Sequence, residues 1–378
     1  MVIHSKVSLM ELNGKKAKTG VLIVNLGTPD SPRTPDVRKY LREFLMDGRV
    51  IDFPAFPRWL LVNLIIAPFR APKSAKIYKE LWTEQGSPLK YYGIRVEQML
   101  QEVLGDDFIV SLGMRYQSPS VETALNALKD KGLEEIIVIP LFPQYASATS
   151  GSVHQKVMEL VKQWQIIPSI NFIDKFYQHP LFVQTFAEIG RKHLNAHHYD
   201  HIIFTYHGLP ERQIRKGDVT NTCLKAAHFP EGKQTAGCCA TIHPMNQNCY
   251  RAQCFETTRL LIQALGLDAA QCTTCFQSRL GKDPWIQPYT EDVIRQLAKE
   301  GKKNVLAFSP SFVADCLETT IEVGEEYKEV FEEEGGEHWQ LVESLNDHPD
   351  WIAMLKALVL EKTTKKVTFA SAKEEVRT

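Results

Sequence analysis

The chain has 378 residues, 44% of them hydrophobic and 24% charged, and its formal net charge at pH 7 is -1. This length can bury a sizeable core and suggests two domains of ordinary size, and the near-zero charge excludes a general binder of nucleic acid or other polyanions. The apolar runs fall short of the ~20 residues that span a bilayer. Residues 1–20 are polar and lack the apolar core of a signal peptide. We therefore expect a cytoplasmic protein.

The predicted elements alternate between short apolar strands and amphipathic helices. In the first half, strands are expected at residues 20–26, 108–112, 136–141 and 170–173, with helices that include 34–45, 93–104 and 121–131. In the second half, strands are expected at residues 202–206, 273–277, 305–308 and 339–342. Alternation of this kind is typical of βαβ units, so the fold class is α/β with two four-stranded parallel sheets flanked by helices.

The two sets of elements resemble copies of one design. Asn25-Leu26-Gly27-Thr28-Pro29 ends the first strand of one half, and Tyr206-His207-Gly208-Leu209-Pro210 ends the first strand of the other, so Leu26 corresponds to His207. A second correspondence pairs residues 142–145 with residues 309–312, which places Gly151 opposite Glu318. We expect an internal duplication in which only the second half kept residues able to do chemistry.

The domain organisation follows from this division. We expect a polar tail at residues 1–18, an N-terminal domain at 19–178, a C-terminal domain at 179–360 and a second polar tail at 361–378. The C-terminal domain carries the candidate catalytic residues and a cysteine-rich insertion at about 220–254.

His207 is the strongest candidate for chemistry because it lies at the end of a buried-looking strand. In open α/β sheets, ligands bind beyond the carboxyl ends of the strands. The strand at 305–308 is followed by Asp315, Cys316 and Glu318, so these side chains are expected to face the same cleft as His207. An imidazole with a pKa near neutrality can accept and pass on a proton. Base, thiol and carboxylates together indicate metal or proton chemistry.

A row of glutamates continues along the helix that follows Asp315. Glu318, Glu322 and then Glu325 or Glu326 recur at a spacing that places them on one helix face. Like charges at this spacing destabilise a helix by about 0.2–0.5 kcal/mol per pair. A solvated acidic face explains the row from Glu325 onward. For Glu318, which lies beside the strand end, we favour a carboxylate that carries a divalent cation or protons.

Motifs of other enzyme classes are missing from the sequence. It contains no G-x-G-x-x-G, Walker loop, G-x-S-x-G or H-E-x-x-H pattern. We therefore expect no nucleotide cofactor.

The chain resembles the ferrochelatases, enzymes that insert Fe²⁺ into protoporphyrin IX to form protohaem. The matching segments lie in order over about residues 20 to 358 and are Val24-Asn25-Leu26-Gly27-Thr28-Pro29, Gln85-Gly86-Ser87-Pro88-Leu89, Gly113-Met114-Arg115-Tyr116, Pro140-Leu141-Phe142-Pro143-Gln144-Tyr145, Tyr206-His207-Gly208-Leu209-Pro210, Phe276-Gln277-Ser278-Arg279 with Pro284-Trp285, Asp315-Cys316-Leu317-Glu318-Thr319 and Glu343-Ser344-Leu345-Asn346.

The resemblance implies two Rossmann-like domains without a dinucleotide, with the porphyrin between them. It implies that the enzyme is a lyase of the final step of haem biosynthesis, with Fe²⁺ as a substrate and two protons released. His207 and Glu318 are then the catalytic pair that binds the iron and handles the pyrrole protons, and Asp315 and Glu322 lie on the path of protons or iron.

The resemblance also implies contacts to the porphyrin. Arg70 and Ser87 match positions near the propionates, Arg115 and Tyr116 match the opposite wall, and Leu26, Trp285 and Phe312 match the apolar lining. For each of these residues, ordinary core packing is the alternative explanation. A core helix is one explanation of the apolar stretch at residues 59–69, and by resemblance the stretch matches a lip that covers the porphyrin and, in some members, touches the membrane. We therefore expect peripheral contact with the inner membrane.

Five cysteines lie between residues 218 and 257, in a segment longer than simpler bacterial ferrochelatases have. Some members of the family hold a [2Fe–2S] cluster, which requires four thiolates. We select Cys223, Cys238, Cys239 and Cys249 as ligands, because Cys254 falls where cluster-free relatives also carry cysteine. A zinc site and reduced structural thiols are the alternatives.

Two other functions stay open. One is a chelatase for another tetrapyrrole, such as coproporphyrin or sirohydrochlorin. The other is a non-catalytic iron–sulfur or redox binding protein, which would not depend on His207. The sequence indicates no oligomeric state.

Overall fold

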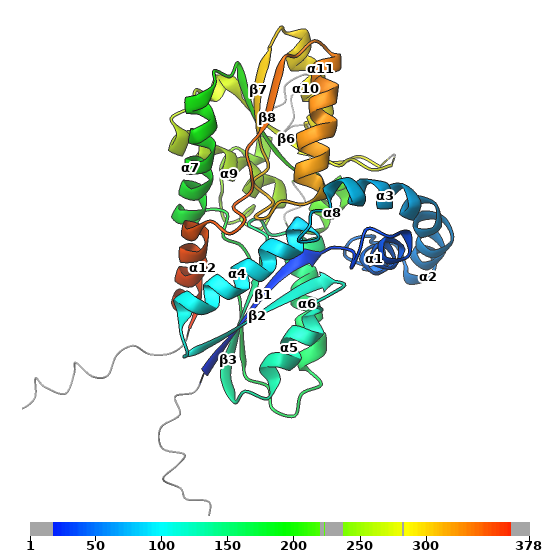
Figure 1. Cartoon of the computed structure of the whole chain (residues 1–378), viewed down its shortest axis with the longest axis vertical. Coiled ribbons are helices and arrows are strands. Elements are labelled where there is room, and N and C mark those ends of the chain that lie inside the picture. Colours follow the sequence, from blue (N-terminus) through cyan, green and yellow to red (C-terminus); the bar gives the residue numbers. More distant parts are fainter. Residues whose placement is uncertain (1–17, 220–222, 224–236, 282, 364–378) are drawn as a thin grey trace, which may run out of the picture.

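The computed structural model describes residues 18–219, 223, 237–281 and 283–363, and it contains two parallel sheets (Figure 1). The first sheet has the order β2-β1-β3-β4, formed by Lys18–Gly27 (β1), Phe108–Tyr116 (β2), Leu133–Pro140 (β3) and Ser169–Phe172 (β4). The second has the order β6-β5-β7-β8, formed by His201–His207 (β5), Cys272–Gln277 (β6), Asn304–Phe308 (β7) and His338–Leu341 (β8). The predicted strands and the duplicated α/β design are confirmed.

The helices of the first half are α1 (Thr34–Met46), α2 (Ala55–Leu60), η1 (Leu61–Ile66), α3 (Ala67–Leu81), α4 (Pro88–Leu104), α5 (Val121–Lys129), η2 (Ser147–Gly151) and α6 (Ser152–Val161). Those of the second half are α7 (Pro180–Ala196), α8 (Glu211–Lys216), η4 (Gly237–Cys239), α9 (Tyr250–Leu265), η5 (Ala269–Gln271), α10 (Thr290–Lys299), η6 (Leu317–Glu326), α11 (Tyr327–Glu333) and α12 (Pro349–Lys362). The predicted helices are present, although α4 begins at Pro88 rather than at Gly93. Proline suits a first helical turn, and Gly93 lies inside α4 because the helix packs closely on Leu112 there.

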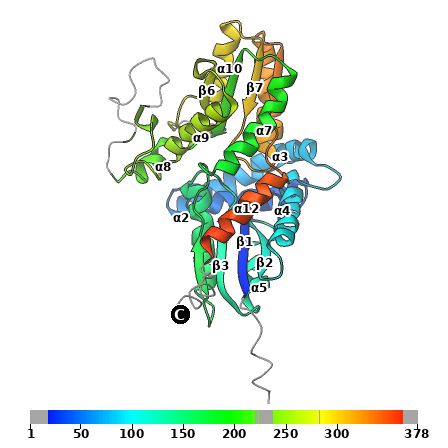
Figure 2. The same cartoon turned by 90° about the vertical axis from the view of Figure 1, so that its left-hand side faces the viewer.

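The sheets are buried on both faces, as expected for parallel strands. Residues 21–24 of β1 have no exposed side-chain surface, and Phe204 in β5 and Phe308 in β7 are equally buried. A single apolar cluster joins the two halves, because it contains Ile23 of β1, Phe204 of β5 and Trp351 of α12. Helix α12 packs against both α4 and α7, and Figure 2 shows it beside them. The boundary near residue 178 stays a prediction.

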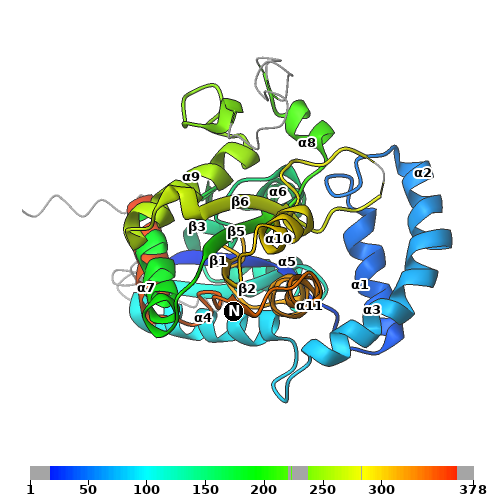
Figure 3. The same cartoon turned by 90° about the horizontal axis from the view of Figure 1, so that it is seen from above.

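Helices α1, α2 and α3, with η1 between α2 and α3, form an arm at one side of the two sheets (Figures 1 and 3). This arm contains the predicted apolar lip, and it exposes six large apolar side chains, which are Phe56, Trp59, Leu60, Leu64, Ile65 and Phe69. Among the described residues, no helix combines the length and the apolarity that crossing a membrane requires.

Candidate functional site

His207 is the last residue of β5 and is half-buried. Its Nδ1 lies 2.7 Å from the carbonyl oxygen of Gly208. A carbonyl oxygen can only accept, so Nδ1 carries a proton, and the neutral form of this imidazole has its lone pair on Nε2. The described residues donate no hydrogen bond to Nε2. The backbone thus fixes both the tautomer and the direction of the imidazole.

Gly208 allows the strand end to lie close to its neighbours. Its N–H donates to the carbonyl oxygen of Gln277 at 2.9 Å. A Cβ at position 208 would lie 2.8 Å from that same oxygen and 3.1 Å from the ring of Trp285. A side chain at 208 would therefore displace the carbonyl that orients His207.

Glu318 lies in the first turn of η6, which follows β7 after a loop, and is half-buried. Gln277, which is paired in register with His207 on the neighbouring strand, joins the two residues. Its Nε2 donates to the carbonyl oxygen of Glu318 at 3.2 Å, and its Oε1 accepts from Thr205 at 3.0 Å. Sequence reasoning did not single out Gln277, although it lies in one of the matching segments.

The carboxylate of Glu318 faces two tyrosines of the arm. Burial raises the pKa of Tyr78 in α3 well above its ordinary value, and the negative charge of Glu318 adds to this. Burial likewise raises the pKa of Tyr40 in α1, with further contributions from Tyr78 and Glu318. Both phenols therefore stay protonated, and Glu318 lies where the second half meets the arm of the first half.

Asp315 and Glu322 are held by protein groups. The carboxylate of Asp315 accepts from Asn346 Nδ2 at 2.7 Å and from the N–H of Ser344 at 3.1 Å. Glu322 accepts from Ser278 Oγ at 2.6 Å, from Gln277 Nε2 at 3.0 Å and from Tyr327 at 3.2 Å. These bonds anchor η6 to the loops around it. The predicted path of protons or iron through the two carboxylates stays a prediction.

Some of the predicted porphyrin contacts lie around this pair. The ring of Trp285 is centred 6.4 Å from the ring of His207. Leu26 packs on the same cluster as Tyr40, Tyr78 and Leu317. Phe312 packs on a neighbouring cluster that contains Leu89 and Cys316. These contacts place apolar side chains from both halves around the strand ends.

The two residues predicted at the propionates differ in their surroundings. Ser87 is 2% exposed, and its hydroxyl has no hydrogen-bond partner among the described residues. Arg70 is exposed on α3. A buried, unpaired hydroxyl is uncommon, so Ser87 is suited to meet a polar group of a ligand.

Arg115 and Tyr116, predicted on the opposite wall, both bind Asp47. Arg115 forms an ion pair with the Asp47 carboxylate at 2.6 Å, and the Tyr116 hydroxyl donates to it at 2.9 Å. Burial alone would raise the pKa of Asp47, but hydrogen bonds from Ser152 and the backbone of Arg49, with the charge of Arg115, lower it. Sequence reasoning missed Asp47, and no motif marked it.

The four predicted cluster cysteines, Cys223, Cys238, Cys239 and Cys249, come together; we call them the cysteine ring. The sulfurs of Cys238 and Cys239 are 3.9 Å apart, and Cys223 and Cys239 each interact with both Cys238 and Cys249. Hydrogen bonds from Cys223 and Cys239 lower the pKa of Cys249. Residues 220–222 and 224–236 of the predicted insertion lie outside the described residues.

The other cysteines lie elsewhere. Cys254 is buried in α9, Cys275 is buried in β6, Cys272 is half-buried at the start of β6, and Cys316 is buried just before η6. The ring therefore consists of the four cysteines that the sequence selected.

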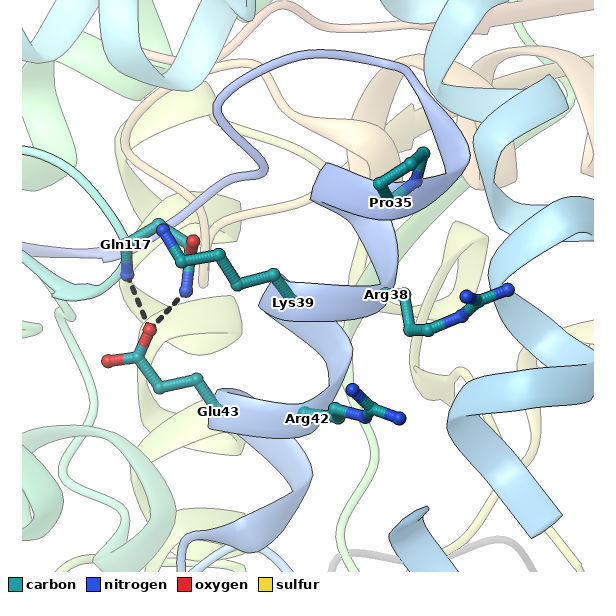
Figure 4. A pocket seen from close by; sticks show the side chains of 6 residues that line it. All are labelled: Pro35, Arg38, Lys39, Arg42, Glu43 and Gln117. Carbon is teal, nitrogen blue, oxygen red and sulfur yellow. Dashed lines mark hydrogen bonds between the residues drawn. The ribbon is translucent and has the colours of Figure 1, made fainter. Parts of the chain in front are cut away.

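A hollow of about 480 Å³ lies beside α1 and is separate from this site (Figure 4). It is lined by Pro35, Arg38, Lys39, Arg42, Glu43 and Gln117. The N–H of Gln117 donates to the Glu43 carboxylate at 3.0 Å. The opposite face of α1 carries Val37 and Tyr40, which are buried in the arm.

Known proteins resemble this chain in sequence over most of its length. The sequence model of the Ferrochelatase family matches residues 18–363. A ferrochelatase of Legionella pneumophila (strain Lens) is 46% identical over 345 residues, which cover 91% of this chain and 99% of the relative. A ferrochelatase of Coxiella burnetii is 43% identical over 340 residues, which cover 89% and 91%. The solved structure of SirB from Bacillus subtilis with Fe³⁺ is 13% identical, with a TM-score of 0.49 over 92% of this chain and 96% of that chain.

Proposed function

The chain belongs to the ferrochelatase family, and we propose that His207 and Glu318 are the residues that perform metal insertion. The family makes the chain a metal chelatase, a lyase of haem biosynthesis with Fe²⁺ and a porphyrin as substrates. This confirms the resemblance seen in the motifs and disfavours a non-catalytic redox protein. The residue roles, the identity of the porphyrin and the cysteine-bound group are our proposals.

The reaction replaces two protons by one metal ion. A porphyrin loses its two pyrrole N–H protons as Fe²⁺ forms bonds to the ring nitrogens, so the charge balances when both protons leave. In our proposal the Nε2 lone pair of His207 takes a proton from the face of the ring. Glu318 holds the iron and removes the other proton. Imidazole and carboxylate bind a divalent cation less tightly than a closed thiolate cage, which suits an ion that must be released.

The observation that carries this proposal is the hydrogen bond from His207 Nδ1 to the Gly208 carbonyl at 2.7 Å. It leaves Nε2 as an acceptor at the strand end, where ligands of α/β sheets bind. Gln277 connects this strand end to Glu318.

We propose protoporphyrin IX as the porphyrin, as the motifs predict, in preference to coproporphyrin or sirohydrochlorin. An apolar lip suits an apolar macrocycle. Arg70 and Ser87 would then bind the propionates, since a guanidinium and a buried hydroxyl both suit a carboxylate.

The test is an anaerobic assay with protoporphyrin IX and Fe²⁺ that follows haem absorbance. His207→Ala and Glu318→Gln should each remove nearly all turnover in folded protein. His193→Ala is the control, because His193 pairs with Glu343 on the surface. Equal turnover in all three variants would refute the assignment. A parallel assay with coproporphyrin tests the choice of porphyrin.

We further propose that the cysteine ring holds a [2Fe–2S] cluster. Four thiolates are required, and the thiols of the ring lie next to one another, with Cys239 buried. Bound there, such a cluster would supply a redox-active, structure-stabilising centre. Zinc is the alternative, so the measurement is metal and acid-labile sulfide content together with a visible spectrum. Iron and sulfide in equal amounts support the cluster, whereas stoichiometric zinc without sulfide would exclude it.

We also propose that the protein works in the cytoplasm at the surface of the inner membrane. The exposed side chains of Trp59, Leu64, Ile65 and Phe69 lie on consecutive helices of the arm. An apolar face of this kind suits insertion at the boundary between lipid headgroups and acyl chains. Sedimentation with lipid vesicles tests it.

A further inference from the structure

The cysteine ring and His207 are connected through a single residue, Tyr250. Cys249 is the N-cap of α9, and Tyr250 is the first residue of that helix. The side chain of Tyr250 is buried, and its hydroxyl donates to the carbonyl oxygen of His207 at 2.9 Å. The backbone of Tyr250 therefore directly follows a cysteine of the cysteine ring, and its hydroxyl contacts the backbone of the proposed catalytic histidine.

The contact reaches both polar backbone groups of His207. The N–H of His207 donates to Ser311 Oγ at 3.4 Å, and the Tyr250 hydroxyl also interacts with Ser311. Tyr250 and Ser311 together therefore fix the backbone from which the imidazole projects.

The carbonyl that Tyr250 binds belongs to the peptide between His207 and Gly208. The next carbonyl, that of Gly208, is the acceptor of His207 Nδ1, and the intervening N–H is bound to Gln277. A rotation of this peptide would move the Gly208 carbonyl, which orients the imidazole of His207. A shift of the Tyr250 hydroxyl would thus move His207 Nε2 through two adjacent peptide units.

A second contact links the cysteine ring to the segment between α1 and α2 of the arm. The N–H of Cys223 donates to Asp218 at 2.6 Å, just after α8. In α8, Gln213 donates to the carbonyl oxygen of Val50 at 3.1 Å, and Arg212 pairs with Asp52 at 2.8 Å. The cysteine ring therefore lies between α9, which contacts His207, and α8, which contacts the segment between α1 and α2.

We propose that Tyr250 is a positioning residue that sets the orientation of His207 and couples it to the state of the cysteine ring. When the ring is intact, Cys249 fixes the start of α9, Tyr250 holds the His207 carbonyl, and Nε2 points at the macrocycle. When the ring is disrupted, the start of α9 shifts and the orientation of His207 changes with it. This inference rests on the role proposed above for His207.

The first test is Tyr250→Phe, which removes only the hydroxyl. Tyr199→Phe is the matched control, because Tyr199 is also buried and its hydroxyl has no partner among the described residues. We expect kcat to fall about tenfold in Tyr250→Phe, with KM for the porphyrin within about twofold, because orientation rather than binding is lost. Unchanged kcat, or the same loss in both variants, would overturn the proposal.

The second test reads His207 directly, without turnover. In protein with nitrogen-labelled histidine, the His207 imidazole resonance is assigned by its absence from His207→Ala. It should shift in Tyr250→Phe and stay in place in Tyr199→Phe. Should Tyr250→Phe fail to fold, Ser311→Ala removes the other member of the link and must shift the same resonance. A resonance that does not move contradicts the positioning role.

The coupling is tested by a double-mutant cycle with Cys223→Ser, which removes one thiol of the ring. This change should shift the His207 resonance in the wild-type background and leave it in place in the Tyr250→Phe background, since interacting sites are not additive. Equal shifts in both backgrounds would show that the ring acts by another route. If His207→Ala keeps full turnover, the proposed function fails, yet the resonances still decide whether Tyr250 couples the two sites.

Discussion

Gly208→Ala should damage the site without touching a reactive group. The added methyl would lie 2.8 Å from the backbone oxygen of Gln277 and 3.1 Å from the ring of Trp285. The first distance is shorter than a carbon can approach an oxygen, and that oxygen belongs to the adjacent strand, so β5 and β6 must separate at their ends. Overpacking of this kind destabilises a protein by about 1–3 kcal/mol. The same displacement moves the Gly208 carbonyl, so kcat should fall more than about tenfold.

Urea unfolding and steady-state assays measure the two effects separately. Gly217→Ala is the control, because a Cβ there would be 3.5 Å from the carbonyl oxygen of Ile214, an ordinary contact. We expect the stability of Gly217→Ala to change by less than about 0.5 kcal/mol. If Gly208→Ala matches this control in both stability and kcat, the close approach of the strands does not position His207.

Three further predictions concern other parts of the chain. Ser87→Ala should raise KM for the porphyrin about three- to tenfold with kcat unchanged. The control is Ser150→Ala, which should leave KM unchanged, because the Ser150 hydroxyl is also buried and has no partner among the described residues. Equal KM values in the two variants would contradict the propionate contact. Burial lowers the pKa of His201 from 6.5 to about 4, so between these pH values the unfolded chain binds more protons than the folded one. The free energy of unfolding should therefore fall as the pH is lowered through this window. In urea unfolding at several pH values, His201→Asn should flatten this pH dependence, and an unchanged dependence would refute the role of His201. Phe69→Glu should weaken sedimentation with vesicles, because Phe69 is 76% exposed on the arm. The control Ile166→Glu should not weaken it, because Ile166 is 82% exposed but lies away from the arm. Equal weakening in both variants would argue against the lip as the membrane contact.

The sheets and the ends of their strands were predictable from sequence because their signals are local. Continuous apolar runs closed by Gly or Pro identify buried parallel strands, and the position of His207 at such an end follows directly. The equivalence of the two halves was readable from short segments after corresponding strands. The shared strand orders β2-β1-β3-β4 and β6-β5-β7-β8 confirm it.

The contacts that complete the site depend on register and on long-range packing, and these leave no local signal. Gln277 reaches Glu318 only because β6 pairs in register with β5. Asp47 meets Arg115 across 68 positions of sequence. The sequence also did not predict that the helix after β7 begins with a π-helical segment at residues 317–326. The pattern of apolar residues does not distinguish the i→i+5 hydrogen bonds of a π-helix from those of an α-helix.

The close packing around Gly151 in the first half yields a last prediction. Gly151, which corresponds to Glu318 in the matching segments of the two halves, is the last residue of the π-helix η2. A Cβ there would be 3.1 Å from the Tyr145 hydroxyl and 3.3 Å from Nη1 of Arg49, whose guanidinium donates to Ser147 at 2.8 Å. Gly151→Glu should therefore destabilise the chain and, combined with His207→Ala, should restore no turnover, as measured by urea unfolding and the anaerobic assay. Recovery of turnover would show that the first half can still accommodate a carboxylate where the second half carries Glu318, and that side-chain chemistry rather than space separates the two.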